Sequence, residues 1–133
     1  MKIFERFHDG SIDGLIIQGT IVRLLLSTEG GQKFTMEARG VLSLKADGFR
    51  QGNIIYEVLE RGCDDLTLDD MMNFFEFKDE ANAHSKLEES RGKDLIVLEV
   101  NPSYGASCGI LAESVELLPG HKQTDHDTVS ASG

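Results

Sequence analysis

In the segment Lys33–Arg39 every second residue is hydrophobic and the residues between them are polar. A period of two is typical of a strand that has one buried face and one face toward water. A second apolar run, Thr20–Ser27, precedes this segment, and the link between the two runs, Thr28–Gln32, contains two glycines. A short glycine-containing link between two such runs predicts a β-hairpin.

Further short strands are predicted on both sides of this hairpin. Eight glycines lie between residues 10 and 52 and separate short runs of β-branched and apolar residues, as expected for strands divided by turns. Strands are predicted at Gly14–Gln18, Val41–Ala46 and Ile54–Arg61. In the last of these, the alternation places Ile54, Tyr56 and Val58 on one face.

The pattern changes to a helical period after residue 66. Thr67 and Asp70 have the spacing of a capping box, in which each residue accepts a hydrogen bond from the backbone N–H of the other. The apolar residues that follow have the spacing of one helix face: Leu68, Met71, Met72 and Phe75. A second, more polar helix is predicted over Asp79–Arg91, and we expect at least the first helix to pack on the sheet.

The chain then returns to strands. Asp94–Val100 and Ala106–Leu118 predict a final hairpin, with a turn at Asn101–Gly105 and a bulge at Gly109.

This order of elements predicts an α+β fold. We expect a mainly antiparallel, curved sheet of about six or seven strands, either a half-barrel or two layers, packed against one or two helices. A single domain is expected over residues 1–118, with strands in 14–61, a helical segment over 67–91 and the final hairpin over 94–118. Residues 119–133 predict a flexible C-terminal tail because they contain few apolar side chains.

Charge narrows the classes of partner. The formal net charge is −10, and residues 57–91 carry eleven acidic and four basic side chains. An acidic surface repels phosphate backbones, so we expect no nucleic-acid partner. Partly because no run of about 18 apolar residues is present, we also expect no membrane association and a cytoplasmic location. Cys63 and Cys108 are expected to be reduced thiols, with Cys108 buried.

Several groups of residues are candidate chemical sites, and for each of them a structural role is the better interpretation. The Asp64, Asp65, Asp69 and Asp70 cluster lacks the calcium-loop spacing and fits helix capping. Asn101–Gly105 lacks the first glycine of a nucleophile elbow and fits a turn. A third cluster, consisting of His121, Asp125, His126 and Asp127, lies in the predicted tail. We therefore predict no catalytic residue, no metal and no cofactor.

Two functional hypotheses follow, and no motif decides between them. The first is a small non-catalytic protein-interaction module, an adaptor or an immunity-like protein, that binds a basic partner through its acidic surface. The alternative is a small-molecule-binding protein or small enzyme that uses the mouth of the curved sheet. The candidate binding residues for such a mouth are His8, Asp9 and Tyr104. The chain is expected to be a monomer or a homodimer, since an unpaired edge strand can pair with its copy.

Overall fold

The computed structural model describes residues 1–75, 77 and 79–123, except for the side chain of Cys63. Within this described part the strands are β1 (Lys2–Ile3), β2 (Ser11–Gln18), β3 (Ile21–Ser27), β4 (Lys33–Arg39), β5 (Ser43–Asp47), β6 (Asn53–Arg61), β7 (Ile96–Tyr104), β8 (Ser107–Ala112) and β9 (Ser114–Pro119). The helices are the short 3₁₀ turns η1 (Glu5–Phe7) and η2 (Cys63–Asp65) and the α-helices α1 (Leu68–Phe75) and α2 (Glu80–Gly92).

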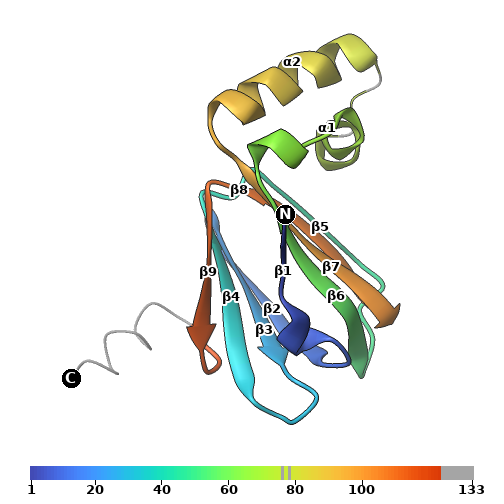
Figure 1. Cartoon of the computed structure of the whole chain (residues 1–133), viewed down its shortest axis with the longest axis vertical. Coiled ribbons are helices and arrows are strands. Elements are labelled where there is room, and N and C mark those ends of the chain that lie inside the picture. The colour runs from blue at the N-terminus through green and yellow to red at the C-terminus, as the bar shows by residue number, and fades with distance from the viewer. Residues whose placement is uncertain (76, 78, 124–133) are drawn as a thin grey trace, which may run out of the picture.

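All strand pairs are antiparallel, in the order β5-β8-β7-β6-β2-β3-β4-β9, and β1 pairs separately with β6. Figure 1 shows that this curved sheet, which is not closed, folds into two layers that diverge toward one end. The layer formed by β2, β3, β4 and β9 faces the layer formed by β1, β5, β6, β7 and β8. The two α-helices lie together at one end of the sheet (Figure 1). The prediction of an α+β fold with a curved antiparallel sheet is therefore confirmed.

The predicted strand Ala106–Leu118 is two strands, β8 and β9, which belong to different layers and meet at Glu113. The Glu113 N–H donates to the backbone oxygens of Arg39 and Gly40, so the partner strand turns at the same place. Gly40 has a φ of 62°, a conformation that favours glycine. The sheet therefore bends at one point where a single long strand was predicted.

The final hairpin differs from the prediction in two further details. Asn101–Tyr104 continues β7, so the turn comes later, at Gly105. Pro102 lies opposite Ile55 at a register shift, where a missing backbone N–H is tolerated. Gly109 pairs without any shift in register. Its missing side chain instead makes room for Phe74, since a Cβ there would lie 3.2 Å from the ring.

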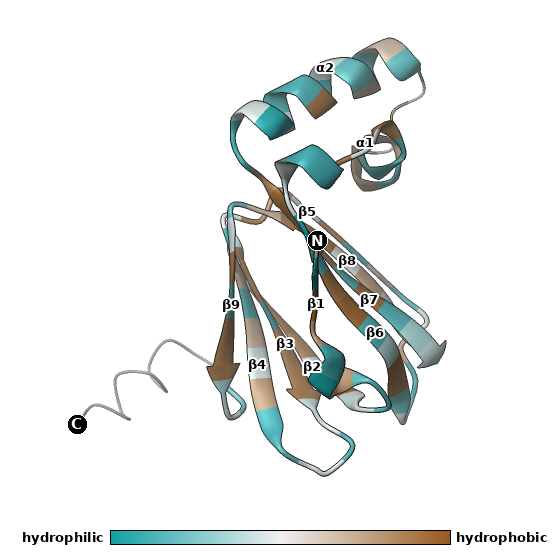
Figure 2. Ribbon diagram, in the orientation of Figure 1, coloured by the Kyte–Doolittle hydropathy of each residue, from teal (hydrophilic) through white to brown (hydrophobic). Residues whose placement is uncertain are grey.

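The main core lies between the two layers. It contains the apolar residues of the alternating segment Lys33–Arg39, which form part of β4. Most of the core comes from β3, β4, β6, β7 and β8, which contribute Val22, Leu24, Leu26, Phe34, Met36, Ala38, Ile55, Val58, Leu98, Val100 and Ile110. In Figure 2, β3 is largely hydrophobic whereas most of α2 is hydrophilic. Because one face of each layer packs on this core, strands near the start of the chain alternate between apolar and polar residues.

The middle of the outer face of β4 is buried too, contrary to the prediction that this face lies toward water, and only Lys33 and Arg39 at its ends are exposed. Glu37 accepts hydrogen bonds from the Nε atoms of Arg23 and Arg39, each at 2.9 Å. Thr35 Oγ1 donates to the Gly120 oxygen and accepts from the Lys122 N–H, both at 2.7 Å. The segment after β9 therefore returns across this face as far as the structure describes it. Residues 124–133 of the predicted tail lie outside the described residues.

A second apolar cluster joins the helices to the end of the sheet. Its buried residues are Leu66, Met71, Ala83, Leu87, Leu95, Val97 and Leu111, and the other residues of the predicted helix stripe pack against it. The capping box is confirmed, since the Asp70 N–H donates to Thr67 Oγ1 at 3.2 Å and the Thr67 N–H donates to Asp70 Oδ2 at 2.8 Å. No helix in the described ranges has the length and apolar character needed to cross a membrane.

Candidate functional site

A surface hollow of about 360 Å³ lies where the N-terminal segment runs beside β6. It is lined by Ile3, Phe4, Glu5, His8, Tyr56 and Glu57. We call it the His8 hollow. Its walls combine aliphatic, aromatic and carboxylate side chains, which are the elements of a site that binds a partly apolar group.

The hollow forms because the N-terminal segment is fixed to β6 at two points and bulges between them. The Phe4 N–H donates to the Val58 oxygen at 3.0 Å, and the Asp9 N–H donates to the Ile55 oxygen at 2.9 Å. Between these points Phe7 enters the core completely. Its ring meets Phe34 edge-to-face at a centroid distance of 5.6 Å, a favoured arrangement. Phe7 thus anchors the 3₁₀ turn whose neighbours line the hollow.

His8 and Asp9, two of the predicted candidates, are in contact at the edge of the hollow. His8 Nε2 lies 3.6 Å from Asp9 Oδ2. His8 Nδ1 lies 2.7 Å from the Tyr56 carbonyl oxygen, so Nδ1 is the donor. The imidazole ring also meets the Tyr56 ring edge-to-face at 5.6 Å. The Tyr56 carbonyl, followed by the Asp9 charge, raises the pKa of His8 above its ordinary value.

Tyr104, the third candidate, does not line the His8 hollow. It lies at the end of β7 opposite Ile54 and is about half exposed. Ile3, Ile54 and Tyr56 are exposed to a similar extent. We call these four residues the apolar strip, because they follow the outer side of β1, β6 and the end of β7.

The prediction that Ile54, Tyr56 and Val58 share one face of β6 is wrong. Val58 is in the core. Strict alternation would place Ile54 and Tyr56 on the same face as Val58. Register shifts between Ile54 and Glu57, however, turn Ile54 and Tyr56 outward and Ile55 inward. A bulge adds a residue to one strand and so changes which residues face the core. For this reason the sequence pattern does not predict that the Tyr56 ring is exposed in the hollow.

The His8 hollow is lined by two carboxylates, Glu5 and Glu57, and by one basic group, the imidazole of His8. Glu5 is exposed, and Glu57 accepts a hydrogen bond from Asn101 Nδ2 at 3.0 Å. No lysine or arginine lines this hollow. Asp9 and Glu29 add negative potential at His8. An anion placed here would be repelled, whereas a cation would be attracted.

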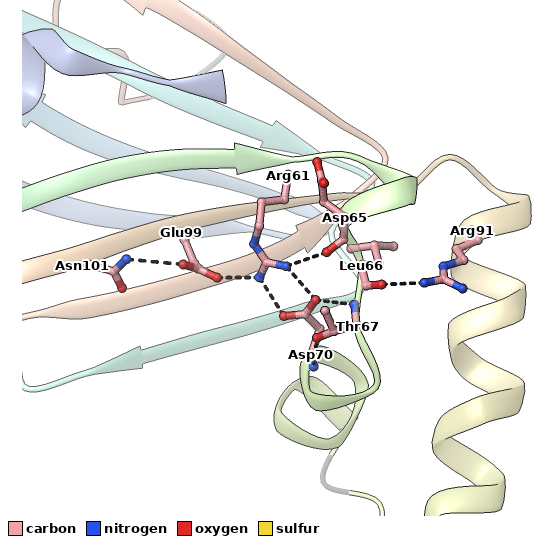
Figure 3. Close-up of polar contacts among 8 residues, drawn as sticks. All are labelled: Arg61, Asp65, Leu66, Thr67, Asp70, Arg91, Glu99 and Asn101. Carbon is pink, nitrogen blue, oxygen red and sulfur yellow. Dashed lines mark hydrogen bonds and ion pairs between the residues drawn. The ribbon is translucent and has the colours of Figure 1, made fainter. Parts of the chain in front are cut away.

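A second polar group, centred on Arg61, lies between the sheet and α1 (Figure 3). Its guanidinium donates to both Asp70 carboxylate oxygens, to Glu99 Oε1 and to the Asp65 backbone oxygen. Asn101 donates to Glu99 and to Glu57, so hydrogen bonds run from this network to the His8 hollow. The hydrogen bond to Asp70 raises the pKa of Arg61. We call this the Arg61 network, and because both terminal nitrogens of the guanidinium are hydrogen-bonded within the fold we assign it a structural role.

The predicted aspartate cluster is divided by the structure. Asp70 belongs to the Arg61 network and to the helix cap. Asp65 Oδ2 lies 3.1 Å from the N-terminal amino group, and Asp69 is exposed in the first turn of α1. Among the described residues, no group of three or more His, Cys, Asp or Glu side chains is arranged to hold a metal ion.

The remaining candidates are the His121 cluster and Cys108, and those that the structure describes contact only other parts of the fold. His121 Nε2 lies 3.1 Å from the Leu26 oxygen and 3.3 Å from Asp13 Oδ2, whereas Asp125, His126 and Asp127 lie outside the described residues. Cys108 is a free, buried cysteine, as predicted. Burial raises the pKa of its thiol to about 12, so the thiol stays protonated at neutral pH and is a poor nucleophile.

Comparison with protein-family models, with curated proteins and with solved structures found no match for this chain.

Proposed function

We propose that this protein is a non-catalytic interaction module that binds a basic protein partner through the His8 hollow and the apolar strip. The observation that carries the proposal is the composition of the hollow, in which two carboxylates lie beside exposed apolar side chains and no lysine or arginine is present. Exposed apolar side chains grouped in this way are typical of interaction surfaces.

The overall charge supports a basic partner. With a formal net charge of −10, the protein attracts a cationic protein over several ångströms and accelerates encounter at low salt. Glu80 and Glu88 on α2 are exposed, and no ion pair within the described residues engages them. The helices thus add to the attraction without belonging to the contact surface.

The alternative, a small enzyme or small-molecule binder, has one observation in its favour, namely the contact between His8 and Asp9. Both side chains are more than half exposed, so water screens their interaction. An activated nucleophile beside them is lacking among the residues that line the hollow. We therefore rank this alternative below the interaction module.

The proposal is tested by co-purification from the native host. The tagged protein is recovered at low salt, and the retained proteins are identified by mass spectrometry. We expect a stoichiometric basic protein that is released at high salt, because surface ion pairs are screened. The variant Tyr56→Ser is expected to lose this partner. Ile17→Ser is the matched control, because Ile17 is an equally exposed apolar residue on β2, in the other layer.

Three outcomes would contradict the proposal. They are an empty protein, a protein with only a small molecule bound, and a partner retained equally by both variants. Light scattering at two concentrations tests separately whether the strip pairs with a second copy of this chain, which would also replace the proposed partner.

A further inference from the structure

We propose that the His8 hollow receives one arginine side chain of the partner, with its apolar stem on Ile3 and Tyr56 and its guanidinium beside Glu5 and Glu57. This inference rests on the proposed function and specifies its chemistry. It follows from the wall of the hollow, from the carboxylates that lack a cation, and from the position of the chain's own cations.

The wall suits a long side chain with an apolar stem and a charged end. Ile3 and Tyr56 are each about half exposed, so a stem laid across them removes apolar surface of both from water. The Tyr56 ring also offers an aromatic face at the edge of the hollow. Guanidinium groups stack on such faces, and more readily than ammonium groups do.

Both carboxylates are available to a cation. Within the part of the chain that the structure describes, no hydrogen bond or ion pair engages the Glu5 carboxylate, and only the Glu5 backbone oxygen accepts, from the His8 N–H. Glu57 accepts only from the neutral amide of Asn101 there. A guanidinium provides five N–H donors in a planar fork that matches carboxylate oxygens. The hollow thus supplies acceptors that the folded chain itself does not neutralise.

Two basic side chains of this chain, Lys2 and Arg6, lie close to the His8 hollow but do not line it. Lys2 and Arg6 border a neighbouring hollow, which shares Ile3, Phe4 and Glu5 with the His8 hollow. The Lys2 ammonium lies 4.7 Å from the centre of the Phe4 ring, and the Arg6 guanidinium lies 5.1 Å from that of Phe34. Neither cation lines the His8 hollow, although the Phe4 ring under Lys2 lines both hollows. The same chemistry is available in the His8 hollow at Tyr56, because no lysine or arginine of this chain lines that hollow.

The experiment is an NMR titration of the ¹⁵N-labelled full chain with Nα-acetyl-L-arginine methylamide. Its uncharged isostere, the citrulline derivative, is titrated in parallel. We expect saturable shifts of the backbone amides of Ile3, Glu5, His8, Tyr56 and Glu57 with the arginine derivative. Because charge-assisted hydrogen bonds are about twice as strong as neutral ones, the citrulline derivative is expected to bind about tenfold more weakly.

The double variant E5Q/E57Q is expected to bind the arginine derivative about tenfold more weakly than the wild type. The control E88Q/E116Q removes the same charge from exposed positions on α2 and β9 and is expected to bind as the wild type does. Equal binding of both derivatives, equal binding by E5Q/E57Q, or shifts spread evenly over the acidic surface would overturn the inference.

Failure here can be distinguished from failure of the proposed function. If co-purification yields a basic partner that Tyr56→Ser loses but E5Q/E57Q retains, the interaction module stands and the arginine site is wrong. If no basic partner is found, the proposed function itself fails.

Discussion

Replacing Arg61 with alanine is expected to lower the free energy of unfolding by about 3 kcal/mol. The Arg61 side chain is only 14% exposed and pairs with Asp70 and Glu99. Removing it leaves two carboxylates without their counter-charge. Breaking a buried ion pair in this way costs about 3–5 kcal/mol, and the lower end applies because Glu99 is 29% exposed. Urea unfolding followed by circular dichroism measures the effect.

Two further variants make this measurement specific to the network. Arg61→Lys keeps the charge but cannot donate to two oxygens of Asp70 in the same plane, so an intermediate loss is expected. Arg50→Ala removes an exposed guanidinium and is expected to stay within about 0.5 kcal/mol of the wild type. If Arg61→Ala is as stable as Arg50→Ala, the network does not hold α1 to the sheet.

The free energy of unfolding measured at acidic pH gives a second test of the same network. Burial would raise the pKa of Asp70, but the hydrogen bonds from Arg61 and from the Thr67 N–H outweigh it, so that the pKa is lowered. A carboxyl whose pKa is lower in the folded state contributes stability above its unfolded pKa and loses that contribution as the pH falls through the folded value. We expect this loss in the wild type below about pH 4, and a smaller one in Arg61→Ala.

Replacing Phe7 with alanine is expected to destabilise the fold by about 4 kcal/mol. Phe7 is fully buried and its ring packs edge-to-face on Phe34. The truncation leaves a cavity in the core and removes the anchor of η1. Since Glu5 and His8 flank this anchor, the His8 hollow is expected to lose its shape even at temperatures where the variant remains folded.

Phe49→Ala is the matched control for this prediction, because Phe49 is 41% exposed and lies between β5 and β6. Its loss is expected to be below about 1 kcal/mol. Thermal unfolding gives the comparison, and amide NMR spectra of folded Phe7→Ala report whether the resonances of Glu5 and His8 move. Equal stability of the two variants would show that Phe7 is not an anchor.

Local signals in the sequence predict those elements that depend on neighbouring residues. The hairpin of β3 and β4 follows from alternation around a glycine-containing link, and its strands lie within one residue of the prediction. The cap of α1 follows from Thr67 and Asp70, whose reciprocal hydrogen bonds need only four consecutive residues. Physical rules of short range suffice for both.

Elements that depend on distant parts of the chain are not predicted. The division of β8 from β9 depends on the turn at Gly40, about seventy residues earlier. The burial of Glu37 depends on Arg23 from a neighbouring strand. Neither partner is visible from the local pattern of hydrophobic and polar positions.

The candidate site shows the same division. His8 and Asp9 are adjacent in the sequence, and their contact at 3.6 Å depends on the positive φ of Asp9 in the turn after η1. Glu5, Tyr56 and Glu57 are not predicted, because the hydrogen bonds from Phe4 and Asp9 bring the N-terminal segment to β6 and a register shift against β7 turns Tyr56 outward. The one signal available is the pair of residues beside Tyr56, because Ile55 and Glu57 would share one face of a regular strand although one is apolar and the other is charged.

The most direct test of the proposed binding surface is site-specific photo-crosslinking in the native host. A benzophenone side chain replaces Tyr56 in one variant and Ile17 in another, and crosslinked products are identified by mass spectrometry. We predict that position 56 captures one basic protein and that position 17, exposed on the other layer of the sheet, captures none. The same products from both positions, or none from position 56, would contradict the proposal.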